Sequence, residues 1–376
     1  MSRALLPLVL LTVACVQPSP LDLDCDLSDR ADPYHPRAAE LQAFLDDQAR
    51  ALDMVGLSLA VRDADGLWIG ATGYADLDTM TPLKGCNIQP VASFTKLMTA
   101  TTVHQAYERG ELRYDDRAGD HLSQDLIGGM ENASEARIEQ LLNHTSGVAE
   151  VLDLDNFVDQ PTYEESFEDV GRVAGETPGE FTYASANYDM AALIVEEVTG
   201  RGHSAVLAED VLDPLGLEHT YYGLARPVPV GRMTRGYTRL RGDTYVEFDL
   251  DYLWEAPVRD EPSGGAVSSV LDMVTLVDAL LRDETVLEQD TLEQVLTFVE
   301  PSQSFVDRHF IGYGLGVIAF DAGTEAIGAS GNLMSYGSDC YYLPEHDITY
   351  ALLYNTVPTE TPELNLALVD LLVDGE

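Results

Sequence analysis

The sequence predicts an α+β fold in which strands from both ends of the chain form one central antiparallel sheet, with a helical part inserted between them. Strand patterns joined by a turn signal lie near the start, helical patterns fill roughly residues 111–300, and strand patterns return near the end. With 376 residues, 45% of them hydrophobic, the chain can bury a substantial core. We therefore expect a domain over residues 37–376, with an α/β part at about 37–92 and 305–376 and a helical part at about 93–304.

The individual elements follow from local patterns. The first are a helix over residues 37–52 and two strands, "GLSLAVRD" and "LWIGATGYAD", which Asp65-Gly66 joins as a hairpin. A second helix follows, because apolar residues recur at helical spacing in "SFTKLMTATTVHQAYERG" and Gly110 is a natural C-terminal cap. Further helical patterns are "EARIEQLL", "NYDMAALIVEEVTG" and "SSVLDMVTLVDALL". The closing strands are "IGYGLGVIAF", "TEAIGAS", "MSYGSDCYYL" and "DITYALLYN", before a last amphipathic helix near residues 362–373.

The composition is strongly acidic. The chain has 65 acidic against 21 basic residues, a formal charge of -44, and Lys84 and Lys96 are its only lysines. Such a surface repels phosphates and anionic headgroups, which argues against nucleic-acid binding and membrane-surface binding as functions. It is typical of a protein adapted to high salt. We expect no metal or organic cofactor, because no cysteine-histidine spacing indicates zinc, and residues 153–156 lack the glycine and glutamate of a calcium loop.

The amino terminus predicts export. Arg3 precedes an apolar run that is too short to span a membrane, so residues 1–14 are interpreted as a signal peptide. "LTVAC" resembles a bacterial lipobox, so we predict lipidation of Cys15, a Pro-rich acidic tether over residues 15–36, and a periplasmic or cell-envelope location; plain secretion is the alternative. The remaining cysteines, Cys25, Cys86 and Cys340, predict one disulfide and one free thiol, with the pairing left open.

Ser93 and Lys96 form the first candidate catalytic pair. If Ser93 begins a helix, Lys96 lies one turn along the same face, within reach of the serine oxygen. A buried lysine can take the serine proton, and the helix amino terminus offers N–H groups to an oxyanion. The alternative is a capping serine followed by a surface lysine. Lys96 lies among apolar residues in a chain that has almost no other lysine, which favours the catalytic interpretation.

Further motifs carry a resemblance to a known family. The segment "GEFTYASANYDMAALIVEEVTG" places a tyrosine at Tyr183, and "LLNHTSGV", "PSGGAVSSVLDM" and "GYGLGV" add landmarks. With Ser93-x-x-Lys96, the chain resembles the serine β-lactamase and penicillin-binding-protein superfamily, in its class C β-lactamase, D-Ala-D-Ala carboxypeptidase and esterase branch. The resemblance covers about residues 38–356. It implies a β-lactamase/transpeptidase-like α/β/α sandwich in which Tyr183 shares the base role with Lys96 and protonates the leaving group.

Within those landmarks, three features are interpreted as structural. His144 and the turn that follows it are expected to end a helix, and Gly264-Gly265 is expected to pack closely before another helix. Asn187, which related sequences often carry, is interpreted as a helix cap. None of these is expected to act on a substrate.

The sequence departs from the family pattern at two motifs. Ser185 stands where the second motif usually has asparagine. The third motif, normally Lys/His-Thr/Ser-Gly, begins with Ala329 and continues with Ser330 and Gly331, so its cation is missing. By the resemblance, Ser185, Ser330 and Gly331 contact the substrate, and the backbone N–H groups of Ser93 and Asn332 form the oxyanion hole. Because the missing cation helps to hold a substrate carboxylate, its absence argues against efficient β-lactam or D-Ala-D-Ala turnover more than against acyl transfer.

The sequence as a whole therefore predicts an exported serine hydrolase that forms an acyl-enzyme. Its partner would be a small-molecule, peptide or ester substrate, and a lipid anchor would be its link to the membrane. The alternative is a catalytically impaired protein of this fold that acts as a binding or scaffold module in the cell envelope. The true substrate and the oligomeric state stay open.

Overall fold

The architecture is built around an eight-stranded sheet. The structure is a computed structural model and describes residues 31–32, 34–150, 173–229, 232–239, 245–248, 261–301, 309–356 and 361–374. The strand order is β3-β2-β1-β12-β11-β10-β9-β8, and all neighbours are antiparallel. The strands are β1 (Gly56–Asp63), β2 (Gly66–Asp76), β3 (Thr81–Pro82), β8 (Phe310–Tyr313), β9 (Ile318–Asp321), β10 (Glu325–Leu333), β11 (Tyr336–Leu343) and β12 (Ile348–Tyr354).

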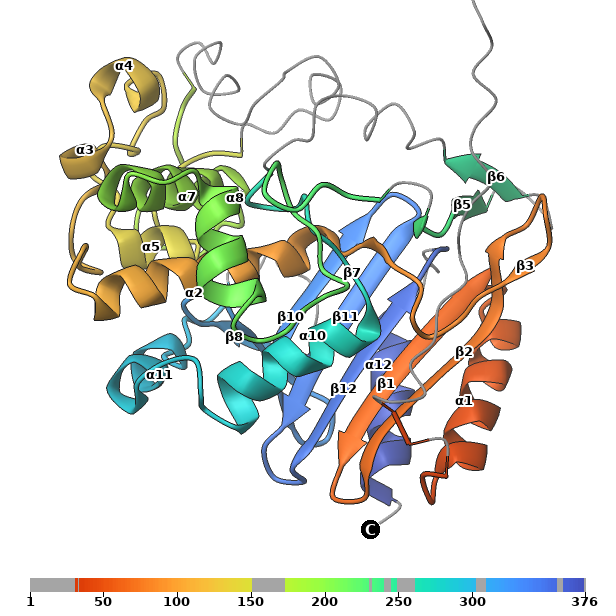
Figure 1. Ribbon diagram of the computed structural model, residues 1–376. Coiled ribbons are helices and arrows are strands. Elements are labelled where there is room, and N and C mark those ends of the chain that lie inside the picture. The colour runs from red at the N-terminus through yellow and green to blue at the C-terminus, as the bar shows by residue number, and fades with distance from the viewer. Residues whose placement is uncertain are drawn as a thin grey trace, which may run out of the picture.

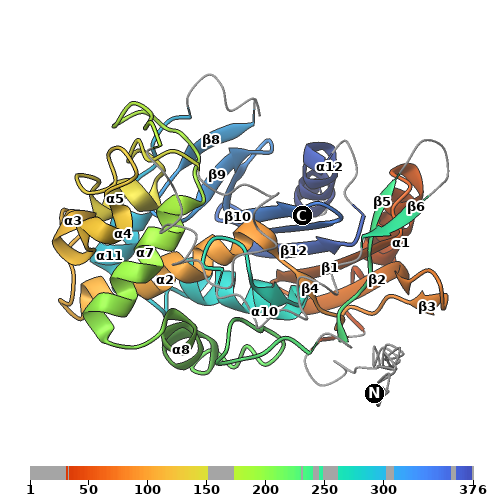
Figure 2. The same cartoon turned by 90° about the horizontal axis from the view of Figure 1, so that it is seen from above.

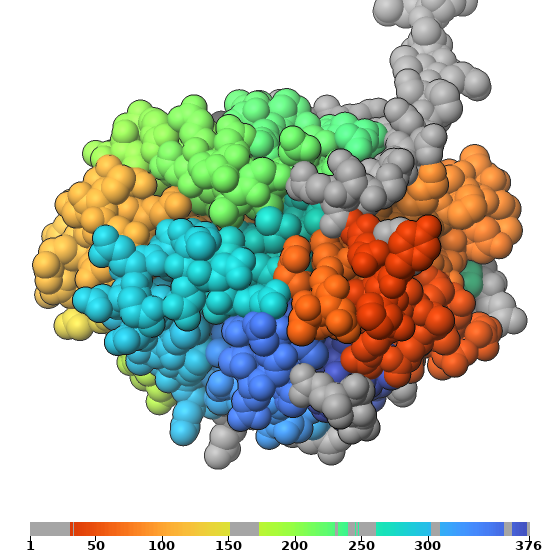
Figure 3. All heavy atoms as spheres, turned by 60° about the horizontal axis from the view of Figure 1, so that its bottom comes forward, coloured from red at the N-terminus to blue at the C-terminus, as the bar shows by residue number. Residues whose placement is uncertain are grey.

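The two ends of the chain meet in the middle of this sheet. Strand β1 pairs with β12, with Leu59 opposite Leu352, and the red and blue ends of the chain lie against each other in Figure 3. The predicted central antiparallel sheet built from both chain ends is confirmed. The strands predicted near the ends are present, because each carries its own apolar pattern between turn residues. One prediction is wrong in its extent: "IGYGLGVIAF" forms two antiparallel strands, β8 and β9, because the chain turns between them at Gly316, which has a φ of 97°.

Helices cover both faces of the sheet. Helices α1 (Ala38–Ala51) and α12 (Thr361–Asp374) lie on one face, and α10 (Val270–Val277), which η4 (Asp278–Arg282) continues, lies on the other (Figure 2). The pleat of β1 divides its side chains accordingly: Leu57, Leu59 and Val61 join the core under α1 and α12, whereas Ala60 joins the core with α10. The result is the predicted α/β/α sandwich.

The inserted helical part lies beside one end of the sheet (Figure 1). Its buried centre is α2 (Thr95–Glu108), on which nearly every side chain is buried, and which packs against α7 (Ala186–Thr199). The chain leaves α2 through Gly110 at a φ of 71°, the left-handed conformation expected of a helix-ending glycine. Further helices among the described residues of this part are α3 (Ala118–His121), α4 (Gln124–Ile127), α5 (Ile138–Leu142), α8 (His203–Val206), η2 (Leu207–Leu212) and α11 (Gln289–Val295).

Two small strand pairs in the middle of the chain were not predicted. Strands β4 (Gln89–Pro90) and β7 (Val267–Ser268) form one, and β5 (Gly236–Arg239) and β6 (Tyr245–Phe248) form the other. Two to four residues are too few to show a strand period, so no sequence pattern could indicate them. The first pair matters for function, because it fixes the two segments that lead into α2 and α10.

The cysteines agree with one disulfide and one free thiol. Cys86 is disulfide-bonded and Cys340 is a buried thiol in β11. The expected signal peptide, Cys15, Cys25 and most of the expected tether lie outside the described residues. Within the described ranges, no helix combines the length and the apolar character needed to cross a membrane.

Candidate active site

Ser93 lies in a tightly held turn at the start of α2. It is the middle residue of η1 (Ala92–Phe94), directly ahead of α2, and Ala92 is held at a φ of 47°. The Thr95 hydroxyl fixes this conformation, since it donates to the Ala92 carbonyl at 2.7 Å and accepts from the Ala266 N–H at 3.0 Å. A non-glycine residue at positive φ costs free energy and persists only where its surroundings enforce it. The turn therefore presents the half-buried Ser93 side chain in one defined direction.

Lys96 lies one helical turn beyond Ser93 and is 1% exposed. Its Nζ lies 3.2 Å from the Ser93 Oγ, 3.3 Å from the Ser185 Oγ and 2.7 Å from the Ser263 carbonyl oxygen. Each N–H of an ammonium thus has one acceptor. The alternative of a surface lysine is excluded by this burial.

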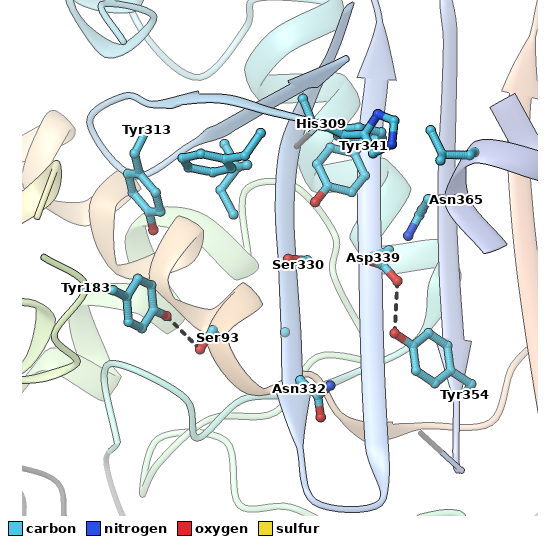
Figure 4. Close-up of a pocket in the computed structure, with 15 residues that line it drawn as sticks. Ser93, Tyr183, His309, Tyr313, Ser330, Asn332, Asp339, Tyr341, Tyr354 and Asn365 are labelled. Carbon is cyan, nitrogen blue, oxygen red and sulfur yellow. Dashed lines mark hydrogen bonds between the residues drawn. The ribbon is translucent and has the colours of Figure 1, made fainter. Parts of the chain in front are cut away.

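Tyr183 completes the cluster from a loop ahead of α7. Its hydroxyl donates to the Ser93 Oγ at 2.9 Å (Figure 4), and the Lys96 Nζ lies 5.0 Å from the centre of its ring. The ring packs against the His144 imidazole, with 4.3 Å between the ring centres. The structure thus brings Ser93, Lys96 and Tyr183 together from two segments 90 residues apart.

His144 supports the tyrosine loop. It follows α5 at a φ of 59°, so the expected helix-ending turn is present, and its Nδ1 accepts the Ala184 N–H at 3.2 Å. Burial lowers the pKa of His144 well below its usual value, and the nearby Lys96 lowers it further. The imidazole is therefore neutral at physiological pH and fixes the backbone next to Tyr183.

Asn187 does not cap α7, so that prediction is wrong. Ser185 is the N-cap residue, and the Asn187 Oδ1 instead accepts from the Ser146 hydroxyl at 2.7 Å. Asn187 is fully buried, and its amide also lies 3.2 Å from the His144 Nδ1. It joins the turn after α5 to the start of α7, a contact between distant segments that a capping pattern cannot reveal.

Gly331 brings the sheet into contact with the Ser93 turn. A Cβ on Gly331 would lie 2.1 Å from the Val91 carbonyl oxygen and 2.8 Å from the Ser93 nitrogen, so no larger residue fits. Asn332 is the next residue of β10, and its backbone is the expected second oxyanion donor. Ser330 lines the cavity in front of Ser93, whereas Ala329 faces the opposite, buried side of the sheet and offers no charge.

Several residues near the site were missed from the sequence. The Ser263 carbonyl is the shortest contact of Lys96, and no sequence pattern indicated it. The close packing expected of Gly264-Gly265 holds for Gly265, where a Cβ would lie 2.7 Å from the Glu261 Cβ. It is wrong for Gly264, where a Cβ would meet only the Ala92 carbonyl carbon, at 3.9 Å. Asp189 is 1% exposed on α7, and burial, with Glu261 nearby, raises its pKa well above the usual value, opposed by Lys96. An acid directly ahead of the apolar run at residues 190–195 of α7 was the available signal.

A cavity of about 310 Å³ opens from Ser93 along the sheet. Ser93 and Tyr183 line one end, Ser330 the middle, and Asp339 with Asn365 the other end (Figure 4). Aromatic side chains from β8, β9 and β11 form much of its wall. Among the described residues no group of three or more His, Cys, Asp or Glu side chains could hold a metal ion.

These features agree with the comparisons to known proteins. The family model described as Beta-lactamase matches residues 41–374, so the chain belongs to the Beta-lactamase family, within the serine β-lactamase and penicillin-binding-protein superfamily of hydrolases. Similar solved structures include D-amino acid amidase from Ochrobactrum anthropi SV3 (TM-score 0.78, 21% identity, covering 90% of this chain and 99% of that one). Another is an octameric penicillin-binding protein homologue from Pyrococcus abyssi (TM-score 0.76, 23% identity, 89% and 77%). At this identity they show the fold.

Curated relatives are also similar over part of their length. Penicillin-binding protein 4 of Amycolatopsis lactamdurans is 30% identical over 167 residues, which are 44% of each chain. Unguisins hydrolase ungD of Aspergillus violaceofuscus is 25% identical over 244 residues, which are 61% of this chain and 42% of that protein. The chain thus matches less than half the length of these two relatives.

Proposed function

We propose that the protein is an exported serine hydrolase that works through a covalent acyl-enzyme on Ser93. The observation that carries this proposal is the position of the Ser93 Oγ, 3.2 Å from the Lys96 Nζ and 2.9 Å from the Tyr183 hydroxyl oxygen. A serine hydroxyl reacts only when a neighbouring group removes its proton, and both candidate bases are in hydrogen-bond contact with it.

The reaction begins with attack of the Ser93 Oγ on the substrate carbonyl carbon, while its proton passes to Lys96 or Tyr183. A neutral Lys96 amine keeps two N–H bonds for Ser185 and the Ser263 carbonyl and directs its lone pair at Ser93. The carbonyl oxygen becomes an oxyanion, which the Ser93 and Asn332 N–H groups stabilise. The bond to the leaving group then breaks as Tyr183 donates a proton to it, and water hydrolyses the acyl-enzyme by the reverse proton transfers.

Esters and amides without an essential carboxylate are the substrates that this site supports best. Ala329 stands where the family places a cation, and neither lysine nor arginine is among the residues that line the cavity in the described parts of the chain. A substrate carboxylate would therefore lack the charge-assisted hydrogen bonds that such a cation supplies. We therefore propose an esterase or peptidase rather than an efficient β-lactamase or D-Ala-D-Ala carboxypeptidase.

The second candidate is a binding or scaffold module of the cell envelope. The missing cation at Ala329 and the serine at Ser185 favour it, because both change the family's substrate contacts. The Ser93–Lys96–Tyr183 contacts favour the enzyme.

Intact mass of the protein with and without Ser93→Ala distinguishes the two candidates. Each form is exposed to a fluorophosphonate, a penicillin and a p-nitrophenyl ester, in low salt and in molar salt. We expect a fluorophosphonate adduct and ester turnover that Ser93→Ala abolishes and that the control Ser134→Ala keeps. A penicillin adduct would show that the altered third motif still accepts a carboxylate. A folded wild-type protein with neither adduct nor turnover would favour the binding module.

Export through a lipid anchor on Cys15 is part of the same proposal. It is supported by the charged and apolar layout of residues 1–14 and the small residue before Cys15. Expression in a bacterial host with a radiolabelled fatty acid tests it: label should enter the wild type and be absent from Cys15→Ser. A wild-type protein that is secreted but carries no radiolabelled fatty acid would indicate export without a lipid anchor.

A further inference from the structure

The end of the cavity away from Ser93 holds a buried carboxyl group. Asp339 on β11 lies directly opposite Ser330 on β10, so the two side chains project from the same face of the sheet. Figure 4 shows Asp339 on the far side of Ser330 from Ser93, and its side chain is 6% exposed. An acidic group therefore lines the cavity in a chain whose third motif has lost its cation.

Two neutral side chains hold Asp339. The Tyr354 hydroxyl donates to its Oδ2 at 3.1 Å, and Asn365 on α12 forms a second hydrogen bond with it. The Asn365 Oδ1 is taken by the Tyr350 hydroxyl at 3.0 Å, which leaves the amide N–H₂ for Asp339. A carboxylate accepts about four hydrogen bonds, so acceptor capacity is left over toward the cavity. Burial raises the pKa of Asp339 to about 6, so it is mostly ionised at neutral pH, and neither lysine nor arginine is among the described residues that line the cavity.

The surrounding wall is apolar and aromatic. Phe310, Phe320 and Tyr341 line the cavity, and the Phe320 and Tyr341 rings meet edge to face with centres 4.6 Å apart. Aromatic faces attract cations as well as apolar carbon. A ligand that suits both the wall and Asp339 has a hydrocarbon body and a positively charged end.

We propose that this end of the cavity is a substrate subsite for a primary ammonium group carried on an apolar arm, with Asp339 as its acceptor. As a substrate subsite, it rests on the proposed hydrolase function. Asp339 lies one strand beyond Ser330, a step of about 5 Å, so the ammonium is several bonds from the carbonyl that Ser93 attacks. The site thus selects the charge opposite to the carboxylate that the family's third motif is built to hold.

Three ligands of similar size and different charge test this subsite: benzylammonium, benzyl alcohol and benzoate. Their dissociation constants for the full chain are measured by ligand-observed NMR in 1 M NaCl, where the Debye length is about 3 Å and the overall charge is screened. We expect wild type to bind benzylammonium about tenfold or more tighter than benzyl alcohol, the size of one charge-assisted hydrogen bond, and benzoate weakest. Equal affinities, or a preference for benzoate, would overturn the proposal.

Two variants separate the charge of Asp339 from its structural contacts. Asp339→Asn keeps the shape of the side chain and removes one negative charge from a chain whose net charge is -44, so the overall charge barely changes. We expect the dissociation constants of benzylammonium and benzyl alcohol to differ by no more than about twofold in this variant. Tyr354→Phe removes a hydrogen bond of Asp339 and keeps the charge, so the preference should persist. Loss of the preference in both folded variants would assign it to their shared network and overturn the proposal, as would an unchanged preference in Asp339→Asn. The wild-type comparison needs no substitution and stands if a variant fails to fold.

Turnover of a p-nitrophenyl ester by the wild type, measured in parallel, separates this inference from the proposed function. Turnover without an ammonium preference would overturn the subsite alone. An ammonium preference that depends on Asp339, with no turnover, would keep the ammonium site and overturn the hydrolase function.

Discussion

Gly331→Ala is the substitution for which the structure gives the clearest magnitude. The new Cβ would lie 2.1 Å from the Val91 carbonyl oxygen and 2.8 Å from the Ser93 nitrogen. Ordinary contacts to a Cβ begin near 3.4 Å, so β10 and the Ser93 turn must separate by about 1 Å. The backbone of Val91 cannot yield easily, because its carbonyl also accepts from the Ser338 hydroxyl at 2.7 Å and its N–H is bonded to Ala266 at 3.0 Å.

This separation would damage activity more than stability. A misplacement of about 1 Å costs roughly a hundredfold in rate, and the loss of one oxyanion donor costs about 10²–10³-fold. We therefore expect kcat/KM for a p-nitrophenyl ester to fall about 10²–10³-fold in Gly331→Ala. Overpacking should lower the free energy of unfolding by about 1–3 kcal/mol.

The assay compares initial rates and urea unfolding of wild type, Gly331→Ala and the control Gly202→Ala. A Cβ on Gly202 would meet only the Glu196 Oε1, at 3.8 Å, so this variant should keep wild-type activity. Near-normal turnover by a folded Gly331→Ala would refute the argument that close contact between β10 and the Ser93 turn forms the reacting geometry.

Three further outcomes are expected. Tyr183→Phe removes the hydroxyl 2.9 Å from the Ser93 Oγ and should lower kcat/KM about 10²–10⁴-fold at an unchanged melting temperature, whereas a loss below tenfold would remove Tyr183 from proton transfer. Burial raises the pKa of Asp339 to about 6, so its stabilising contribution is greatest at low pH and is lost as the pH rises through 6. The wild type should therefore lose about 1–1.5 kcal/mol of unfolding free energy between pH 5 and pH 8 that Asp339→Asn does not lose, as measured by urea unfolding. A difference in unfolding free energy between the two proteins that is the same at both pH values would contradict the raised pKa of Asp339. Because the chain carries a charge of -44, the melting temperature should rise by several degrees from 0.1 M to 2 M NaCl as screening reduces self-repulsion, and a fall would argue against adaptation to salt.

Local patterns predicted most of the fold. Strand β1 and helix α1 match their predicted bounds within a residue or two, since each has an apolar period and a turn signal of its own. The Ser93–Lys96 contact was also predictable, because three residues along a helix form one turn and no tertiary information is needed. The resemblance to the family then supplied Tyr183, which no local pattern could connect to Ser93.

What only the tertiary structure decided lies between segments far apart in the chain. The Ser263 carbonyl that holds Lys96 is 167 residues away from it, and Asp339 enters the cavity because β11 pairs with β10. Sequence periodicity shows which face of an element is apolar, but it carries no record of which element that face meets. The sequence therefore determined the class of fold and the contact between Ser93 and its neighbouring lysine, through short-range geometry. The other acceptors around that lysine were decided by packing within the helical part, and the acidic end of the cavity by the pairing of β11 with β10.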